Sequence, residues 1–536
     1  MIHSRSIGSH LSSIDSPKRL NLKFIEISLV PPMYLMGIDI GTSSTKVLII
    51  DHLGKTIAKS SMEYPVKSPL EGYAEQDPEA WWTATKVSVR RALKEAGVKG
   101  SDISAVGFSG QMHGTVILGK NGEPLRDAII WLDKRSLNEC DEIYKKIGRE
   151  KVLKIVSNLI MPGFTGPTLL WIKKNEPQIF NKIFKVLLPK DYVRFRLTGS
   201  LNTDFSDASA TLLFDVGRRM WSDHIISSLD FPRDIFPEVL ESMQIAGEVT
   251  ADASRETGLS AGTPVVAGGG DSQVGAMGCG VIEPGLISSN IGTGGQVFAA
   301  INEFKFDPKY RVHTFCHVVP GKWCLQGAIL SAGLSLKWFR DNFAQAESVV
   351  GSLCNINPYE LLSREAELSE PGCNGLVFLP YLLGERSPHM DPSARGGFFG
   401  LTLNHKRSHF VRAIMEGVVF ALRDCIEVFK ELGVKVESIV ARGGGARSDL
   451  WLQIQADIFN SKVLKVDVEE DPAFGAALLA GIGIGIYRDF KEACEKTVRF
   501  TTVKYPDGER VKIYNRIYSK IYRNLYYSLR DYWAPN

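Results

Sequence analysis

Two aspartates that adjoin glycine-rich turns could carry chemistry in this chain. Asp39 lies inside an apolar stretch just before one such turn, and Asp271 follows three consecutive glycines. A carboxylate buried in an apolar strand needs a cation or hydrogen-bond donors, so Asp39 is either a magnesium ligand or an acceptor for its own turn. Asp271 is placed as a general base that a substrate could approach closely, with the N-cap of the following helix as the alternative.

Two turns rich in glycine and hydroxyl residues could bind an anion. Backbone N–H groups can converge on a ligand there because no Cβ blocks the approach, and hydroxyl groups add donors. Each turn taken alone could be an ordinary tight turn, but two in one chain suit a polyphosphate. The first turn is Gly41, Thr42, Ser43, Ser44 and Thr45, and the second is Gly292, Thr293, Gly294 and Gly295.

Other catalytic signatures are absent from the sequence. It contains no G-x-x-x-x-G-K-[ST], H-E-x-x-H or G-x-S-x-G motif. The glycines of residues 481–485 follow an Ala/Leu run, which predicts a structural turn at a helix end. His405 and His409 have the spacing of metal ligands, but no third ligand is in view, so we expect solvated residues at a helix start. The 8 cysteines include no C-x-x-C pair, which favours free thiols in a reducing cytoplasm.

Short strands and long helices must position these residues. The apolar runs 36–40 and 46–50 flank the first turn and predict a β-hairpin, so the sheet is mixed rather than Rossmann-like. Residues 105–109 predict a strand that ends at Gln111, Met112 and His113, where α/β sheets present side chains to ligands. Helices are expected over about 81–93, with Asp77 as N-cap and Gly97 as its end, and over about 409–432.

The second half of the chain repeats the strand and glycine signals of the first half. They occur at residues 265–271, 286–295 and 439–446. We therefore expect two lobes of related α/β design with a boundary near residues 277–285, although the similarity is too weak to be a sequence repeat.

Composition excludes several classes of protein. The chain has 536 residues, 44% of them hydrophobic, and a net charge of only +3, so it can bury a large core but has no global field for nucleic acid or membrane surfaces. No apolar run is long enough to span a membrane. Residues 1–32 lack the features of a signal peptide and are expected to be a disordered extension or a misplaced start, with Met33 or Met36 as the true beginning.

The C-terminal tail carries tyrosines and basic residues at four-residue spacing. Tyr514, Tyr518, Tyr522 and Tyr526 predict an amphipathic helix docked on the second lobe. Contact between two subunits is the alternative, and it would make the protein a homodimer.

Nine segments of the chain resemble one known family in order. The sequence is similar to the FGGY carbohydrate kinases of the actin-like ATPase superfamily, most closely to their xylulokinase branch, from residue 34 to about 500. The segments are Gly-Ile-Asp-Ile-Gly-Thr-Ser-Ser-Thr-Lys (37–46), Glu-Gln-Asp-Pro-Glu-Ala-Trp-Trp (75–82), Ser-Gly-Gln-Met-His-Gly (109–114), Met-Pro-Gly-Phe-Thr (161–165), Lys-Asp-Tyr (190–192), Thr-Asp-Phe-Ser-Asp-Ala-Ser (203–209), Gly-Gly-Gly-Asp (268–271), Gly-Glu-Arg-Ser-Pro (384–388) and Gly-Gly-Gly-Ala-Arg-Ser (443–448).

The resemblance implies an α/β fold of two actin-like, ribonuclease H-like ATPase lobes with mixed sheets and a central cleft that binds ATP and a sugar. The lobes would cover residues 33–280, with the sugar site, and 281–536, with the nucleotide site. By this similarity Asp271 would be the base and would touch the sugar, and Asp39 would help to hold Mg²⁺. The two glycine turns would face the phosphates, while Gln111, Met112 and His113 would line the sugar pocket. Gly443, Gly444, Gly445, Ala446 and Arg447 would border the adenosine.

The same resemblance implies ATP-dependent phosphorylation of a ketopentose, with D-xylulose and its 5-phosphate as the expected substrate and product. Two departures weaken the choice of sugar: Ser272 and Gln273 stand where xylulokinases usually have Asn and Ala, and Thr168 stands where they commonly have Lys. A kinase for another sugar, polyol or sugar acid, and a catalytically silent sugar sensor, are the alternatives. Retention of both Asp39 and Asp271 favours a catalyst over a sensor.

Overall fold

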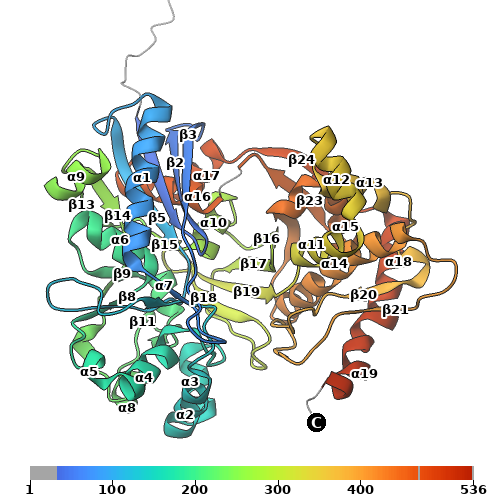
Figure 1. The fold of residues 1–536 in the computed structure, drawn as a ribbon, viewed down its shortest axis with the longest axis horizontal. Coiled ribbons are helices and arrows are strands. Elements are labelled where there is room, and N and C mark those ends of the chain that lie inside the picture. The colour runs from blue at the N-terminus through green and yellow to red at the C-terminus, as the bar shows by residue number, and fades with distance from the viewer. Residues whose placement is uncertain (1–32, 469–470, 534–536) are drawn as a thin grey trace, which may run out of the picture. The chain divides into compact units, whose positions relative to one another are not determined.

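The computed structural model describes residues 33–468 and 471–533, so the interpretation of residues 1–32 lies outside the described residues. Within the described ranges the chain forms two seven-stranded mixed sheets with helices packed on them (Figure 1). The predicted α/β class with mixed sheets is therefore confirmed.

The first sheet is built around the predicted hairpin. Its order is β13-β14-β5-β1-β2-β3, with β15 added beside β5. β1 pairs antiparallel with β2 and parallel with β5. The strands are β1 (Tyr34–Ile40), β2 (Ser44–Asp51), β3 (Thr56–Glu63), β5 (Ile103–Gly110), β13 (Ile245–Glu248), β14 (Pro264–Val266) and β15 (Gly269–Gly270).

The second sheet has the same central pattern. β16 pairs antiparallel with β17 and parallel with β22, as β1 does with β2 and β5. Asn290 and the turn at Gly292 therefore occupy the places of Asp39 and the turn at Gly41, which confirms the related design of the two halves. In sheet order the strands are β18 (His313–Cys316), β19 (Trp323–Ile329), β17 (Gly295–Ile301), β16 (Gly285–Ile291), β22 (Val436–Arg442), β23 (Lys462–Val466) and β24 (Phe500–Lys504).

Small two-stranded ladders and helices complete the first half. The ladders join β4 (Glu75–Gln76) to β7 (Ala128–Ile129), β6 (Val116–Leu118) to β8 (Lys185–Leu187), β9 (Asn202–Asp204) to β12 (Glu238–Leu240), and β10 (Phe214–Asp215) to β11 (Met220–Trp221). The helices are α1 (Pro78–Ala96), α2 (Leu137–Ile147), α3 (Arg149–Val156), α4 (Thr165–Asn175), α5 (Pro177–Phe180), α6 (Pro189–Thr198), α7 (Phe205–Ser209), α8 (Asp223–Ser228), α9 (Ala251–Thr257) and α10 (Asp271–Gly278).

The second half has longer helices. They are α11 (Gly333–Phe343), α12 (Gln345–Cys354), α13 (Pro358–Ala366), α14 (Arg407–Glu431), α15 (Asp449–Phe459), α16 (Asp471–Gly483), α17 (Phe490–Thr497), α18 (Gly508–Ile517) and α19 (Arg523–Trp533), with the 3₁₀ turn η3 (Gly444–Arg447) and the β20 (Val377–Leu379) to β21 (Gly397–Phe399) ladder.

Local signals set the helix ends as predicted. The Asp77 carboxylate accepts a hydrogen bond from the Glu79 amide, and Gly97 closes α1 at φ 66°, a left-handed conformation that glycine adopts without steric cost. The predicted helix over 409–432 is α14. The glycines of residues 481–485 lie at the end of α16, as expected.

Helix α16 comes from near the end of the chain but packs on the first sheet. A Cβ at Gly37 or at Gly107 would lie 1.8 Å from the carbonyl oxygen of Ala473 or Ala476, respectively. Only glycine allows this approach of helix to strand. Figure 1 shows α16 beside the blue strands of that sheet.

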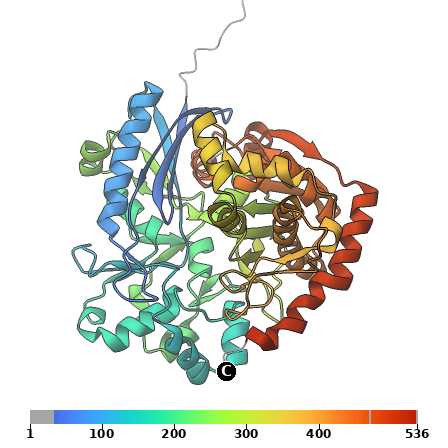
Figure 2. The same cartoon turned by 45° about the vertical axis from the view of Figure 1, so that its right-hand side comes forward.

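The predicted docking of the C-terminal tail is confirmed. Tyr514, Tyr518, Tyr522 and Tyr526 are all buried, and the rings of the first three pack around Phe420 of α14. Figure 2 shows these terminal helices in red along the edge of the second half. A π-helical segment (Tyr518–Tyr522) keeps the tyrosine stripe facing α14.

The prediction of solvated histidines is wrong for His409. Its ring is buried, its Nδ1 accepts from the Lys406 amide at 3.0 Å and its Nε2 contacts the Asn374 amide group at 3.1 Å. The residue caps α14 instead of facing water. Over the described ranges, no group of three potential ligand residues could hold a metal ion, and no helix is long and apolar enough to cross a membrane.

Candidate functional site

Strand pairing brings the two predicted aspartates together. Ser109 of β5 pairs with Asp39 of β1 on one side and with Gly269 of β15 on the other. Its hydroxyl donates to Asp39 Oδ1 at 2.9 Å. Asp271 follows β15 directly as the first residue of α10, so the two carboxylates lie at the carboxyl ends of β1 and β15, the strands on either side of β5.

The environment of Asp271 suits a general base. Burial raises its pKa to about 7, and the negative charge of Asp39 acts in the same direction, while a hydrogen bond from Ser272 and the charge of Arg442 oppose the shift. A base is most effective when its pKa lies near the working pH. The alternative role as N-cap is wrong, because Gly270 occupies that position.

Ser272 links the base to the second sheet. Its hydroxyl donates to Asp271 Oδ1 at 3.2 Å and accepts from Gln296 Nε2 of β17 at 3.0 Å. Gln273, the other departure, is fully buried with its amide nitrogen 4.0 Å from Cys324 Sγ. Of the two unusual residues, Ser272 is therefore the one in contact with the base.

A fully buried ion cluster lies behind the glycine turn that carries Asp271. Lys190 Nζ lies 2.5, 2.9 and 3.1 Å from carboxylate oxygens of Asp191, Asp204 and Asp207. Burial raises the pKa of Asp207 well above its usual range. Removing a cation from such a cluster would leave buried charges uncompensated, which is strongly destabilising.

The ion cluster holds both ends of the turn over residues 267–270. Arg194 joins the cluster through an ion pair with Asp191 at 3.0 Å, and its Nη1 donates to Ala267 O at 3.0 Å. At the other end Gly270 N donates to Ser206 Oγ at 2.9 Å, and Ser206 N donates to Asp204 Oδ2 at 2.7 Å. The position of Asp271 therefore depends on this cluster.

The predicted sugar-binding segment lies beside the same turn. Met112 is so close to Gly270 that a Cβ there would lie 2.8 Å from Met112 Cγ. His113 has φ 72°, stacks on Phe164 with ring centroids 3.7 Å apart, and has a pKa lowered to about 3 by burial. The imidazole is thus neutral and fixed in place.

Gln111 is tied to the first glycine turn by a residue that the sequence reasoning missed. Its Nε2 donates to Gln76 Oε1 at 2.8 Å, and Gln76 Nε2 donates to Thr42 O at 2.7 Å. Trp131 Nε1 also donates to Thr42 Oγ1 at 3.0 Å. The motif at residues 75–82 contained Gln76, but its role depends on contacts that no local pattern encodes.

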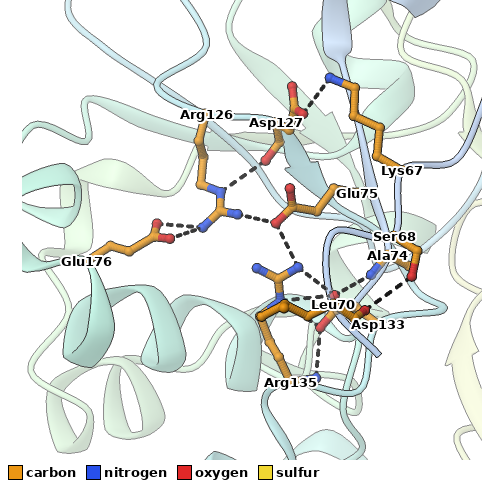
Figure 3. Close-up of polar contacts among 10 residues, drawn as sticks. All are labelled: Lys67, Ser68, Leu70, Ala74, Glu75, Arg126, Asp127, Asp133, Arg135 and Glu176. Atoms are coloured by element: carbon orange, nitrogen blue, oxygen red, sulfur yellow. Dashed lines mark hydrogen bonds and ion pairs between the residues drawn. The ribbon is translucent and has the colours of Figure 1, made fainter. Parts of the chain in front are cut away.

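Figure 3 shows the ion pairs that hold the segment carrying Gln76. Glu75 bridges Arg126 and Arg135, and Arg135 also pairs with Asp133 at 2.8 Å. Asp133 Oδ2 in turn accepts from the Ala74 amide at 2.7 Å. Because these groups are largely buried, the segment beside the first turn is rigidly supported.

The second glycine turn opens into a cavity of about 750 Å³. Its walls come from the turn, from η3 and from helices α11, α13, α14 and α15. Lining residues include Gly292, Thr293, Lys337, Tyr359, Glu360, Met415, Gly444, Gly445, Arg447 and Trp451. This mixture of apolar walls and a few polar groups is typical of a cofactor or nucleotide pocket.

The other predicted phosphate and adenosine residues shape the turns without lining this cavity. Gly294 O accepts from Gly292 N at 3.0 Å, Gly295 begins β17, and Ala446 is buried in η3. Gly443 has φ 71°. In the first turn, Gly41 N donates to Ser44 O at 3.0 Å, Ser43 O accepts from Tyr64 N at 3.1 Å, and Thr45 is buried in β2.

Comparisons with known proteins identify the family to which this arrangement belongs. The N-terminal domain model of the FGGY family of carbohydrate kinases matches residues 34–278, and its C-terminal domain model matches residues 287–484. A xylulose kinase from Bacillus subtilis is 40% identical over 484 residues, 90% of this chain and 95% of that protein. A gluconokinase from the same organism is 32% identical over 88% of this chain and 92% of that protein.

Solved structures share the fold. The crystal structure of xylulose kinase from Rhodospirillum rubrum superposes with a TM-score of 0.85 at 28% identity, covering 93% of this chain and 99% of that one. The predicted two-lobed fold is thus also the fold of solved kinases.

Proposed function

The chain belongs to the FGGY family of carbohydrate kinases, and from that premise we propose that it transfers the γ-phosphate of ATP to the 5-hydroxyl of D-xylulose. Relatives described as xylulose kinases support this choice of sugar. The observation that carries the proposal is the placement of Asp39 and Asp271 at the carboxyl ends of β1 and β15, which both pair with β5. Burial there raises the pKa of Asp271 to about 7. A positioned base of that pKa can accept the hydroxyl proton as the phosphoryl group is transferred.

Each part of the site has one task in this mechanism. The cavity beside Gly292 and Gly444 would hold the adenosine, and the first glycine turn would face the phosphates. Met112 and His113 would hold the sugar against the turn that carries Asp271. Asp271 Oδ would then accept the proton from the attacking hydroxyl, whose oxygen bonds to the γ-phosphorus while the bond from that phosphorus to the bridging oxygen breaks and ADP leaves.

Asp39 and Asp271 fit a magnesium site. Mg²⁺ is usually bound by one or two carboxylates together with substrate phosphates and water. Burial, and after it the negative charge of Asp39, raises the pKa of Asp271, and a bound cation would relieve that repulsion. Asp39 would hold the ion. When bound, Mg²⁺ would neutralise charge on the transferred phosphates.

A sugar panel tests the proposal. With ATP and Mg²⁺, kcat/KM for D-xylulose should exceed that for gluconate, glycerol and L-ribulose when ADP release is measured. A higher value for gluconate would place the protein with the gluconokinases, and no turnover on any sugar would favour a silent sensor.

Location and assembly are part of the proposal. All eight cysteines are free thiols in the described residues, which supports a reducing cytoplasm. A homodimer through α19, whose Tyr527 and Tyr532 are exposed, is the subunit arrangement that we would test by sedimentation.

A further inference from the structure

A second histidine lies near His113 but comes from the other sheet. His313 of β18 is only 3% exposed. Its ring stacks on Phe315 at 5.6 Å, and the His113 ring lies 6.0 Å from the same phenylalanine. Figure 1 shows β18 reaching beside α7 of the first half.

Hydrogen bonds fix the tautomers of both imidazoles. His113 Nδ1 bonds to the Ala210 carbonyl oxygen at 2.9 Å, so this nitrogen carries the proton. His313 Nδ1 lies 3.1 Å from Asn158 Oδ1, an oxygen that also accepts from the Thr314 amide, so it too is the donor. Burial keeps the pKa of each imidazole at about 3. Both Nε2 atoms are therefore acceptors, and neither has a hydrogen-bond partner in the described part of the chain.

Arg386 supplies hydrogen-bond donors that complement these two imidazole acceptors. It lies in the segment over residues 384–388, which β19 holds: Ser387 N donates to Ala328 O at 2.8 Å, and Leu330 N donates to Glu385 Oε1 at 3.3 Å. The Ser387–Ala328 bond sets Arg386 beside β19, two residues along from Gln326, which is opposite His313 in the ladder. After burial, the positive charge of Arg386 also lowers the pKa of His113 and of His313. Within the described ranges this guanidinium makes no hydrogen bond and no ion pair.

One further polar group near His313 lacks a partner. Gln326 of β19 is directly opposite His313 in the ladder, so their side chains share a face of the sheet. Its amide oxygen is buried without a hydrogen-bond partner among the described residues. Buried polar atoms normally have partners, so this oxygen is an acceptor that a ligand hydroxyl could use.

The two neutral imidazole Nε2 atoms, which accept hydrogen bonds, and the planar guanidinium of Arg386, which donates them, match the hydroxyl groups of a polyol. Each hydroxyl can donate to an imidazole nitrogen and accept from a guanidinium at once. We propose that His313 and Arg386 bind the acceptor sugar together with His113, so that the second half of the chain supplies part of the sugar pocket. This inference rests on the proposed kinase function. A bound sugar would then contact elements of both sheets.

Two variants test the assignment. Arg386→Met removes the donors, and His313→Phe removes the acceptor while keeping a ring that can stack on Phe315. Each variant should raise the KM for the sugar, and the Kd for the sugar measured by calorimetry, about tenfold or more. This is the effect of losing about one hydrogen bond to a charged or buried group. The KM for ATP should change by less than about twofold. Arg386→Lys should recover part of the affinity. Arg395→Met is the control, because Arg395 is an exposed arginine of the same connection between β20 and β21 that bonds only to nearby carbonyl groups; its sugar KM should match that of the wild type.

The outcomes separate this inference from the proposed function. If the sugar panel selects a sugar other than D-xylulose, the choice of substrate fails and the variants are measured with the selected sugar. A sugar KM and Kd unchanged by Arg386→Met and His313→Phe would overturn the inference, as would a fall in kcat alone, which would assign Arg386 to the phosphoryl group. If the wild type neither binds nor phosphorylates any sugar, both proposals are wrong.

Discussion

Two pairs of glycines, one on each side of the site, have opposite surroundings. On the side of Asp271, glycines let backbones touch: a Cβ at Gly107 would lie 1.8 Å from Ala476 O. On the side of the cavity, a Cβ at Gly292 or Gly444 would meet no atom closer than 3.7 or 3.8 Å, respectively. Gly37 and Gly107 thus permit close packing, whereas Gly292 and Gly444 leave space for a ligand. The neighbouring Gly443 and Gly445 hold the cavity wall in place, because a Cβ there would lie 2.4 Å from Asn290 Oδ1 or 2.7 Å from Ile291 Cβ, respectively.

This difference indicates how the two sides would work. The base is positioned by packed and buried charges behind it, the cluster around Lys190, so its geometry is set before any ligand binds. The nucleotide side offers room and backbone donors, so its contribution is binding. Substitutions on the base side should therefore change kcat or stability, and those on the cavity side should change KM for ATP.

The largest effect is expected from Asp271→Asn. The amide cannot accept the hydroxyl proton, so kcat should fall about 10²–10⁴-fold, while calorimetry should find unchanged ATP affinity. Asp252→Asn, an exposed aspartate of α9 with a side chain 81% accessible, serves as the control. Turnover of Asp271→Asn near the wild-type rate would remove Asp271 from the mechanism.

The same carboxylate predicts a pH profile. Because the base must be ionised and its pKa is raised to about 7, activity should fall as the pH drops below about 7 and level off above it. The Ser272 hydrogen bond lowers that pKa, so Ser272→Ala should move the acid limb of kcat/KM to higher pH. An acid limb that stays in place would show that another group controls the profile.

The cavity side is tested by Gly444→Val. Since a Cβ fits there, the fold should survive, but the side chain would occupy the cavity. KM for ATP should rise about 10–100-fold, a loss of about 1.4–2.8 kcal/mol, with KM for the sugar unchanged. Gly107→Ala is the matched contrast and should instead lower the melting temperature, because its Cβ has no room. If Gly444→Val were the unfolded variant, the contrast between the two sides would be wrong.

A smaller effect is expected from Ser206→Ala, which removes the acceptor of the Gly270 amide. The Gly270 amide would then be buried without an acceptor, which should lower the free energy of unfolding by about 1–3 kcal/mol. The displaced turn should also lower kcat and leave the KM for ATP unchanged. Ser209→Ala removes another buried hydroxyl of α7, bonded to Ser206 O and Cys316 N. It should lose similar stability and keep kcat, whereas equal kcat losses would show that Ser206 has no special role at the turn.

Local patterns predicted the elements but only part of the site. Asp77 and Gly97 fixed the ends of α1, and the apolar runs around Gly41 fixed the β1-β2 hairpin, because each signal acts within a few residues. Asp39 and Asp271 could be identified because each adjoins a glycine turn. Their proximity depends on the pairing of β1 with β5 and of β5 with β15, in which Ser109 is opposite Asp39, 70 residues away, and opposite Gly269, far later in the chain.

The functional residues that could not be predicted from the sequence were missed for one common reason. His313 is a single histidine in a strand, and Arg386 lay inside a quoted motif without an assigned role. Both reach the neighbourhood of His113 only through β18 and β19 of the second sheet, and no spacing along the chain reports that contact. Likewise, the Ala/Leu run of α16 gave no sign that it covers the first sheet.

The smallest effect is expected at Thr168, where the family resemblance would imply Lys. Thr168 is fully buried in α4, and its hydroxyl has no hydrogen-bond partner among the described residues. Thr168→Val removes an orphan polar group with little change of shape, so it should be neutral or stabilise the fold by up to about 1 kcal/mol. In the same helix the Thr165 hydroxyl donates to His113 O at 3.0 Å, so Thr165→Val should cost about 1 kcal/mol instead. Urea unfolding of both variants gives the comparison. Equal losses would mean that water or another ligand satisfies the Thr168 hydroxyl, and the interior on the base side would then be less completely packed than its glycines indicate.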